Sequence, residues 1–147
     1  MHRVQGGCQC GNITYLAELS HSPSFYHPRS CSCDFCTSHN ASYVSDKSGT
    51  LKITIQNPGD LIRYRQGSRL ADFLICRKCG VMTGVCYEEN TSVYASINVC
   101  STDEYDAFAE SEVAHLTQQS DEERIRRWKD IWFANVVIEY QTLQAAD

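Results

Sequence analysis

The chain has 147 residues, of which 42% are hydrophobic, and a formal net charge of -5. This length and composition suffice for one domain with its own core, so we expect a single domain over residues 1–147. The negative charge argues against general binding of nucleic acid, which needs a cationic surface. No stretch approaches the roughly 20 apolar residues of a membrane span and no secretory start is visible, so we expect a cytoplasmic protein.

Alternating hydrophobic residues predict a mostly β fold with chiefly antiparallel sheet. The expected strands are residues 13–19, 51–56, 61–65, 69–75 and 93–99. The second and third strands are separated by Asn57-Pro58-Gly59-Asp60, a sequence typical of turns. These two strands are therefore expected to form a hairpin.

A helix is predicted near the C-terminus, over about residues 121–133. Glu123 follows Ser120 at the spacing of a capping box, which is typical of a helix start. Four apolar residues then share one helical face, namely Ile125, Trp128, Ile131 and Trp132. We expect this face to pack on the sheet, with binding of a partner as the alternative, and the charged residues Arg124, Arg126 and Arg127 to face solvent.

Seven of the nine cysteines gather in three short clusters. These are Cys8-x-Cys10, Cys31-x-Cys33-x-x-Cys36 and Cys76-x-x-Cys79. An odd total, spacings of one or two residues and the lack of a secretory start favour thiolates on metal ions over disulfides. An iron-sulfur cluster is a weaker alternative, because its usual cysteine spacings differ from these.

The two outer clusters supply four thiols and the middle cluster supplies three. Structural zinc uses four protein ligands, whereas catalytic zinc commonly uses three and keeps one position open. Cys8 and Cys10 would share a face in extended backbone, and Gly11 and Gly80 suit turns that need positive φ. The pattern therefore predicts one closed site and one site with three cysteines.

The fourth ligand of the middle cluster is left open by the sequence. Water, a substrate thiolate or a carbonyl oxygen would make the site catalytic. Asp34, His39, Cys86 or Cys100 would instead close it into a second structural site.

Two further groups of residues are candidates for substrate binding. Arg63, Arg65 and Arg69 could receive a carboxylate, because guanidinium groups bind carboxylates through two hydrogen bonds. Surface charges on the expected hairpin are the simpler interpretation. Four aromatic residues either line a pocket near the middle cluster or belong to the core, namely Tyr26, Phe35, Tyr43 and Phe73.

The ordered cysteine motifs resemble the signature of the glutathione-dependent formaldehyde-activating family, which also includes centromere-protein-V-like proteins. The matching segments are Gly7-Cys8-Gln9-Cys10-Gly11-Asn12-Ile13, Cys31-Ser32-Cys33-Asp34-Phe35-Cys36, Cys76-Arg77-Lys78-Cys79-Gly80 and Ser96-Ile97-Asn98-Val99-Cys100. The resemblance covers about residues 4–106. Residues 107–147 form a C-terminal extension that matches no motif of the family.

The resemblance implies a compact, zinc-containing antiparallel β fold with two zinc ions per chain. By motif position, the structural zinc takes Cys8, Cys10, Cys76 and Cys79, and the catalytic zinc takes Cys31, Cys33 and Cys36. The implied activity is carbon-sulfur lyase chemistry that joins glutathione to formaldehyde. The catalytic zinc would act either on the aldehyde oxygen or on the thiol sulfur. A non-enzymatic zinc-stabilised module that binds a protein is the main alternative, and chromatin association would require a local basic patch.

Overall fold

The computed structural model describes residues 1–114 and 119–141, and within them the fold is mostly β. A four-stranded sheet has the order β1-β2-β5-β11. Its strands are β1 (His2–Gly7), β2 (Ile13–Leu19), β5 (Thr50–Ile55) and β11 (Asn135–Tyr140). Ile13, Tyr15 and Leu19 are buried on one face of β2, which confirms the strand predicted from their alternation.

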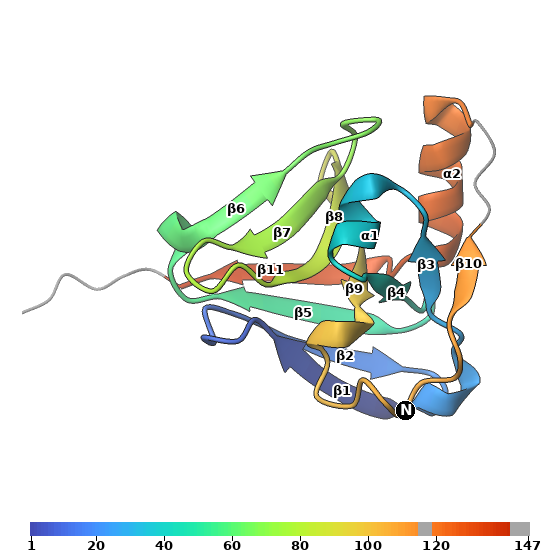
Figure 1. Cartoon of the computed structure of the whole chain (residues 1–147), viewed down its shortest axis with the longest axis horizontal. Coiled ribbons are helices and arrows are strands. Elements are labelled where there is room, and N and C mark those ends of the chain that lie inside the picture. The colour runs from blue at the N-terminus through green and yellow to red at the C-terminus, as the bar shows by residue number, and fades with distance from the viewer. Residues whose placement is uncertain (115–118, 142–147) are drawn as a thin grey trace, which may run out of the picture.

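A seven-stranded sheet lies against the first and has the order β10-β3-β4-β9-β8-β7-β6 (Figure 1). Its strands are β3 (Arg29–Cys31), β4 (Ser42–Val44), β6 (Leu61–Tyr64), β7 (Asp72–Cys76), β8 (Met82–Glu89), β9 (Ser92–Asn98) and β10 (Glu112–Ala114). Pairs β3–β10 and β5–β11 are parallel, whereas the other pairs are antiparallel. Both sheets are therefore mixed, although antiparallel pairing predominates as expected.

The hairpin predicted around residues 57–60 is wrong. Strand β5 pairs with β2 and β11 in the smaller sheet, whereas β6 pairs with β7 in the larger sheet. The short helix η2 (Pro58–Asp60) carries the chain from one sheet to the other. The crossing is held by Asn12, whose side chain accepts from Asn57 N–H at 2.7 Å and donates to the Asn57 carbonyl at 3.2 Å.

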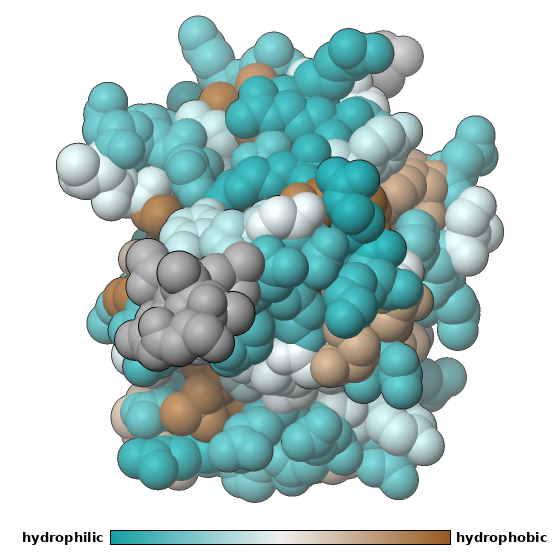
Figure 2. Space-filling model, turned by 90° about the vertical axis from the view of Figure 1, so that its left-hand side faces the viewer, coloured by the Kyte–Doolittle hydropathy of each residue, from teal (hydrophilic) through white to brown (hydrophobic). Residues whose placement is uncertain are grey.

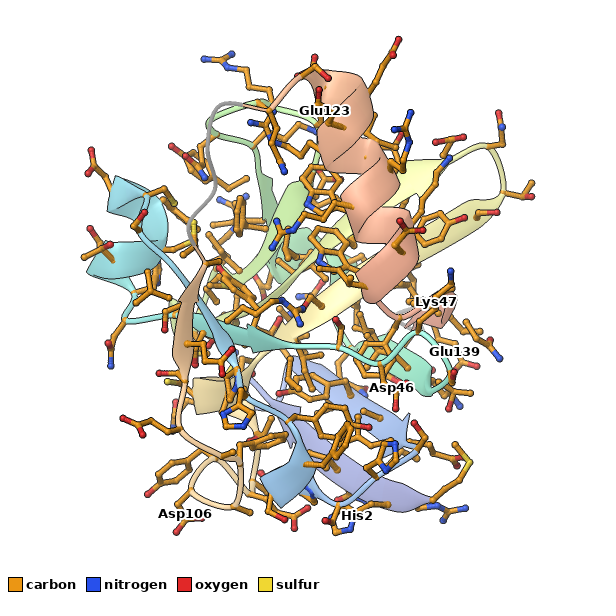
Figure 3. The ribbon with its side chains drawn as sticks, turned by 90° about the vertical axis from the view of Figure 1, so that its right-hand side faces the viewer. His2, Asp46, Lys47, Asp106, Glu123 and Glu139 are labelled. Carbon is orange, nitrogen blue, oxygen red and sulfur yellow. The ribbon has the colours of Figure 1, made fainter. Side chains whose placement is uncertain are left out.

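The helix predicted over about 121–133 is observed as α2 (Asp121–Ile131). The Ser120 hydroxyl accepts from Glu123 N–H, so the predicted cap is present. The helix ends earlier than expected because Trp132 is extended and Phe133 pairs with Ala95 of β9. Figure 3 shows α2 with Glu123 near its start and Lys47 near its end, where Lys47 lies 3.9 Å from Asp130.

The C-terminal extension predicted over 107–147 is part of both sheets. It supplies β10 to the larger sheet, β11 to the smaller sheet and α2 beside the larger sheet, while residues 115–118 and 142–147 lie outside the described residues. The sheets share one core that includes Ile13, Leu51, Leu74 and Ile97. In the described part of the chain, no helix combines the length and apolar character needed to cross a membrane.

A second buried cluster lies where α2 meets the larger sheet. It contains Cys36, Tyr43, Phe73, Met82, Val85, Trp128 and Trp132. The indoles of Trp128 and Trp132 stack, with ring centroids 4.8 Å apart. The apolar face of α2 therefore packs on the sheet, as expected, and encloses the region around the middle cysteine cluster.

Candidate metal centres and the adjoining cavity

The two outer cysteine pairs lie together in space, as the predicted site of four thiols requires. The Sγ atoms of Cys8, Cys10, Cys76 and Cys79 all lie within 4.8 Å of one another. Cys10 Sγ lies 3.8 Å from Cys8 Sγ and 3.5 Å from Cys76 Sγ. Four sulfurs about 2.3 Å from a tetrahedral ion would lie about 3.8 Å apart. The spacing therefore fits a four-thiolate site, and this group could bind a metal ion.

Each of these pairs sits on a turn. Gly11 N–H donates to the Cys8 carbonyl at 3.2 Å, so Cys8 and Cys10 converge through a turn rather than through the extended backbone that we expected. Gly80 N–H likewise donates to the Cys76 carbonyl at 2.8 Å. Gly11 and Gly80 have φ values of 85° and 77°, which confirms the positive φ expected of them.

Burial and hydrogen bonds shift the pKa values of three of these thiols in different directions. Burial raises the pKa of Cys8, and it raises the pKa of Cys76 to about 12. Burial also acts on Cys79, but hydrogen bonds from the backbone of Val81 and Cys10 outweigh it and lower the pKa of Cys79 to about 6. Cys79 is thus more readily ionised than Cys8 or Cys76 in the absence of a metal.

The middle cluster forms a separate group of three thiols. Cys31 ends β3, Cys33 precedes α1 (Asp34–Ser38), and Cys36 lies within α1. The short helix brings the sulfurs together, and Cys36 N–H donates to Cys33 Sγ at 3.3 Å. The three Sγ atoms lie within 4.8 Å of one another. This group could also bind a metal ion.

No fourth ligand from a described His, Cys, Asp or Glu residue joins these three thiols. Asp34 and His39 are outside the group, and the His39 ring packs on Phe35 with centroids 4.6 Å apart. Cys86 instead lies 3.7 Å from an Arg63 nitrogen, and Cys100 lies 3.6 Å from the Asn40 carbonyl. The sequence left two alternatives for this group, a site with an open coordination position and a site closed by a fourth protein ligand. The described residues favour the open position.

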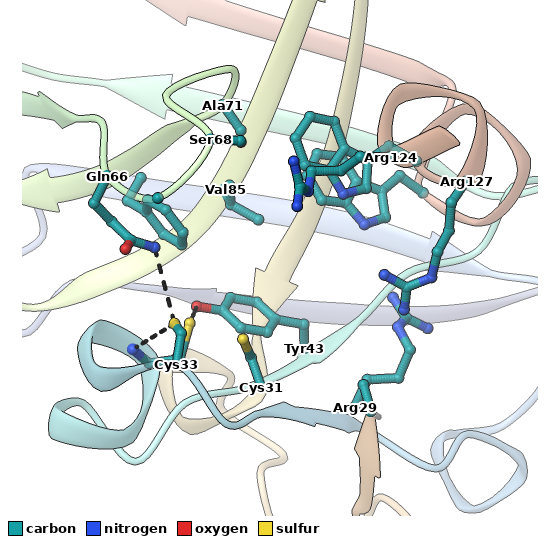
Figure 4. A pocket seen from close by; sticks show the side chains of 16 residues that line it. Arg29, Cys31, Cys33, Tyr43, Gln66, Ser68, Ala71, Val85, Arg124 and Arg127 are labelled. Atoms are coloured by element: carbon teal, nitrogen blue, oxygen red, sulfur yellow. Dashed lines mark hydrogen bonds between the residues drawn. The ribbon is translucent and has the colours of Figure 1, made fainter. Parts of the chain in front are cut away.

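Neighbouring groups stabilise negative charge on Cys31, whereas the hydrogen bond with Cys31 and burial raise the pKa of Cys36. A hydrogen bond with Cys36 lowers the pKa of Cys31 to about 5 against the effect of burial, and the positive charge of Arg127 acts in the same direction. The Tyr43 hydroxyl lies 3.2 Å from Cys36 Sγ, and the Gln66 amide donates to Cys33 Sγ at 3.8 Å (Figure 4). Burial raises the pKa of Tyr43, so its hydroxyl remains protonated and can donate.

The three thiols line one side of a cavity of about 250 Å³. Tyr43 and Phe73, two of the four aromatic candidates, form part of its wall together with Val85, Trp128 and Trp132. Phe35 packs against Phe73 with centroids 4.6 Å apart. Tyr26 instead donates to Asp46 at 2.6 Å and does not line the cavity.

The arginines at the cavity differ from those predicted. Arg63 and Arg65 lie against Asp72, with N–O distances of 3.1 and 2.7 Å, and Arg69 lies on a turn with φ of 62°. These three do not line the cavity, whereas three other arginines do, namely Arg29, Arg124 and Arg127. The expectation that Arg124 and Arg127 face only solvent is therefore wrong. The sequence did contain a signal for this placement. Arg124 lies three and four residues before Arg127 and Trp128 on α2, and residues at these spacings share a helical face.

Comparison with known proteins gives a fold relative but no function. No family model matches the chain, and no curated protein matches it. A solved structure of a Rhodobacter sphaeroides protein, from a structural genomics programme, is 28% identical over 68% of this chain and 88% of that chain, with a TM-score of 0.52. Its description states no activity. The chain is therefore characterised by its β fold and by two groups of cysteines that could bind metal ions.

Proposed function

We propose that the protein is a zinc-dependent enzyme of the carbon-sulfur lyase type, which joins a thiol to a small aldehyde. Glutathione and formaldehyde are the substrates that the motif resemblance implies. The observation that carries the proposal is the group of Cys31, Cys33 and Cys36, which has no fourth described ligand and opens onto a cavity. Three protein ligands and an accessible position are typical of catalytic zinc.

In the proposed reaction, a thiol sulfur attacks the carbonyl carbon of the aldehyde. A carbon-sulfur bond forms while the carbon-oxygen π bond breaks, and the proton of the thiol ends on the oxygen to give a hydroxymethyl thioether. The reverse reaction breaks the carbon-sulfur bond and releases the aldehyde. Zinc held by the three cysteines would supply Lewis-acid activation of one of the two reactants.

The residues around the cysteines have defined parts in this proposal. Tyr43 and Gln66 stabilise negative charge on Cys36 and Cys33 through their hydrogen bonds. Phe73, Val85 and Trp128 limit the access of water and hold the reactants together.

We assign the group of Cys8, Cys10, Cys76 and Cys79 to a structural zinc ion. Four protein thiols complete a tetrahedral site and leave no position for a substrate, and the sulfur distances support this arrangement.

A non-enzymatic protein-binding module is supported less well. Such a module requires no open metal position, whereas the three-cysteine group lacks a fourth ligand among the described residues. It also requires an exposed apolar surface. On the face shown in Figure 2, hydrophobic residues form small areas separated by polar residues.

Exchange NMR of formaldehyde with several thiols tests the reaction. The zinc-loaded protein should bind two ions and accelerate adduct exchange. Cys33→Ser should bind one ion, remain folded and lose the acceleration. Cys100→Ser is the matched control, because Cys100 belongs to neither group, and it should retain both ions and full activity. Failure of the zinc-loaded protein to accelerate exchange with any thiol would refute the proposed reaction.

A further inference from the structure

Three arginines line the same cavity as the three cysteines. Arg29 comes from β3, whereas Arg124 and Arg127 come from consecutive turns of α2, in the part of the chain that matches no family motif. Figure 4 shows Arg127 directed toward Arg29 and Arg124 directed over the cavity, while Cys33 lies on the other side of the Tyr43 ring from α2 and Cys31 lies between Cys33 and Arg29 in this view. The cavity therefore has a thiol end and a guanidinium end.

Described carboxylates do little to neutralise the guanidinium end. Arg29 donates to the hydroxyls of Ser45 at 2.7 Å and of Ser96 at 3.5 Å, and these partners carry no charge. Arg124 lies 3.4 Å from Asp121, a carboxylate that is 67% exposed and therefore weakly paired. Asp and Glu are absent from the described lining.

The cysteines themselves cannot balance this charge. Three thiolates around a divalent ion carry a single net negative charge, so three guanidinium groups leave the cavity positive. Burying like charges side by side is unfavourable unless an anion neutralises them. The positive end is thus suited to an anionic ligand.

The surface between the two ends is mainly apolar. Tyr43, Phe73, Val85 and Trp132 contribute to it, and the stacked indoles of Trp128 and Trp132 form a flat wall beside the arginines. The cavity of about 250 Å³ has room for a compact ligand. The cysteine end of the cavity suits a thiol or aldehyde group of a ligand, and the arginine end suits an oxyanion.

We propose that Arg29, Arg124 and Arg127 form a subsite that binds the carboxylate of a short thiol acid, whose sulfur points toward Cys31, Cys33 and Cys36. Guanidinium groups bind carboxylates through paired, charge-assisted hydrogen bonds, which explains why arginine suits this position. The assignment rests on the proposed function, since it places the thiol substrate in the same cavity. It adds that α2 determines which thiols are accepted.

Three probes with the same two-carbon spacer test the subsite. These are 3-mercaptopropionate, neutral 2-mercaptoethanol and cationic cysteamine, each titrated calorimetrically into the zinc-loaded chain. Hydrogen bonds to a charged group predict that 3-mercaptopropionate binds roughly ten- to a hundredfold more tightly than 2-mercaptoethanol. Cysteamine should bind most weakly, because its ammonium group meets the arginines.

Variants of α2 separate recognition from folding. Arg127→Gln should reduce the preference for 3-mercaptopropionate over 2-mercaptoethanol to a few fold or less, while Arg127→Lys should retain part of it. Arg126→Gln is the matched control, because Arg126 is exposed on the same helix and does not line the cavity. It should behave as the original chain. Equal binding of the three probes, or a preference that persists in an Arg124→Gln, Arg127→Gln double variant, would overturn the subsite.

The binding and exchange measurements distinguish the two proposals. A preference for 3-mercaptopropionate without accelerated exchange would support the subsite and refute the reaction. Acceleration that is equal for all three thiols, together with equal binding, would support the reaction and refute the subsite.

Discussion

At the scale of single residues, the Tyr43 hydroxyl connects the buried cluster to the candidate catalytic site. Tyr43 is 8% exposed, and its hydroxyl lies 3.2 Å from Cys36 Sγ. Hydrogen bonds to metal ligands orient them and tune their charge, and their loss commonly lowers metal affinity about 10- to 100-fold. Tyr43 is thus a positioning residue for Cys36 rather than a group that reacts.

Replacing Tyr43 with Phe should weaken zinc binding at the three-cysteine site by at least about tenfold, because the Cys36 sulfur loses its donor. The four-cysteine site should keep its affinity, since Tyr43 does not contact it. Competition with a chelating indicator, which resolves the two ions by their affinities, measures the change.

Tyr15→Phe is the matched control. The Tyr15 hydroxyl is also buried and hydrogen-bonded, but its partner is Ser101 at 2.7 Å and not a cysteine. Both variants should lose about 1 kcal/mol of unfolding free energy with the hydrogen bond. Only Tyr43→Phe should release zinc more readily. Equal zinc affinity in the two variants would contradict the role of Tyr43.

The difference between predictable and unpredictable site residues is physical. Cys31, Cys33 and Cys36 are close in sequence, so their convergence could be predicted from local spacing. Gln66 reaches the same cavity through tertiary packing, and no local pattern indicates that meeting, whereas Arg29 lies two residues before Cys31 on β3 and shares its face of the strand. The resemblance to a family could not supply Arg127 either, because it covers only about residues 4–106.

At the scale of elements, the turn after Cys76 depends on its glycine. Gly80 has φ of 77°, and a Cβ built there would have no atom within 4 Å. A left-handed conformation costs a residue with a side chain about 1–2 kcal/mol. The cost of a substitution at this position is therefore conformational rather than steric.

Gly80→Ala should lower the unfolding free energy of the zinc-loaded protein by about 1–2 kcal/mol, measured by urea denaturation. Gly80→Asn should be milder, because Asn tolerates this conformation better. Gly59→Ala is the control for backbone conformation, since Gly59 has no positive φ, and its Cβ would require only a small shift of the Asn57 side chain, whose Oδ1 would lie 3.3 Å away. Its effect should stay within about 0.5 kcal/mol. Similar losses at both glycines would argue against strain at Gly80.

Clear periodicity located some elements, whereas others were missed, among them strands β1 and β11 of the smaller sheet. Strand β2 and helix α2 show clear alternation or helical periodicity, and both were expected. Strand β8 has five consecutive buried residues from Met82 to Cys86 and shows no simple alternation, so it was missed. The hairpin prediction around residues 57–60 was wrong because a turn sequence does not determine which sheet the next strand joins.

At the scale of the whole molecule, the four-cysteine group joins parts of both sheets. Cys8 and Cys10 lie between β1 and β2 of the smaller sheet, whereas Cys76 ends β7 of the larger sheet. The link between Cys10 and Cys76 spans 66 positions of the sequence. The three-cysteine group, in contrast, closes only a short segment between β3 and α1.

Loss of the ion from the four-cysteine group should therefore affect global stability more. The relation used for disulfide loops gives about 4 kcal/mol for a closed loop of this length and about 2 kcal/mol for a loop of about six residues. Cys10→Ser and Cys33→Ser provide a comparison, because neither side chain is fully buried and serine can replace Cys33 before α1. Each variant should bind one zinc ion.

In urea denaturation with zinc, Cys10→Ser should lose at least about 2 kcal/mol more unfolding free energy than Cys33→Ser, following the difference in loop length. With a strong chelator present, the original chain and Cys10→Ser should become equally stable, because the cross-link is then absent from both.

If Cys33→Ser proves the less stable variant in zinc, the assignment of the four-cysteine group as the structural link between the sheets fails. If the difference between Cys10→Ser and the original chain persists without metal, the serine itself disturbs the turn and the ion is not its cause.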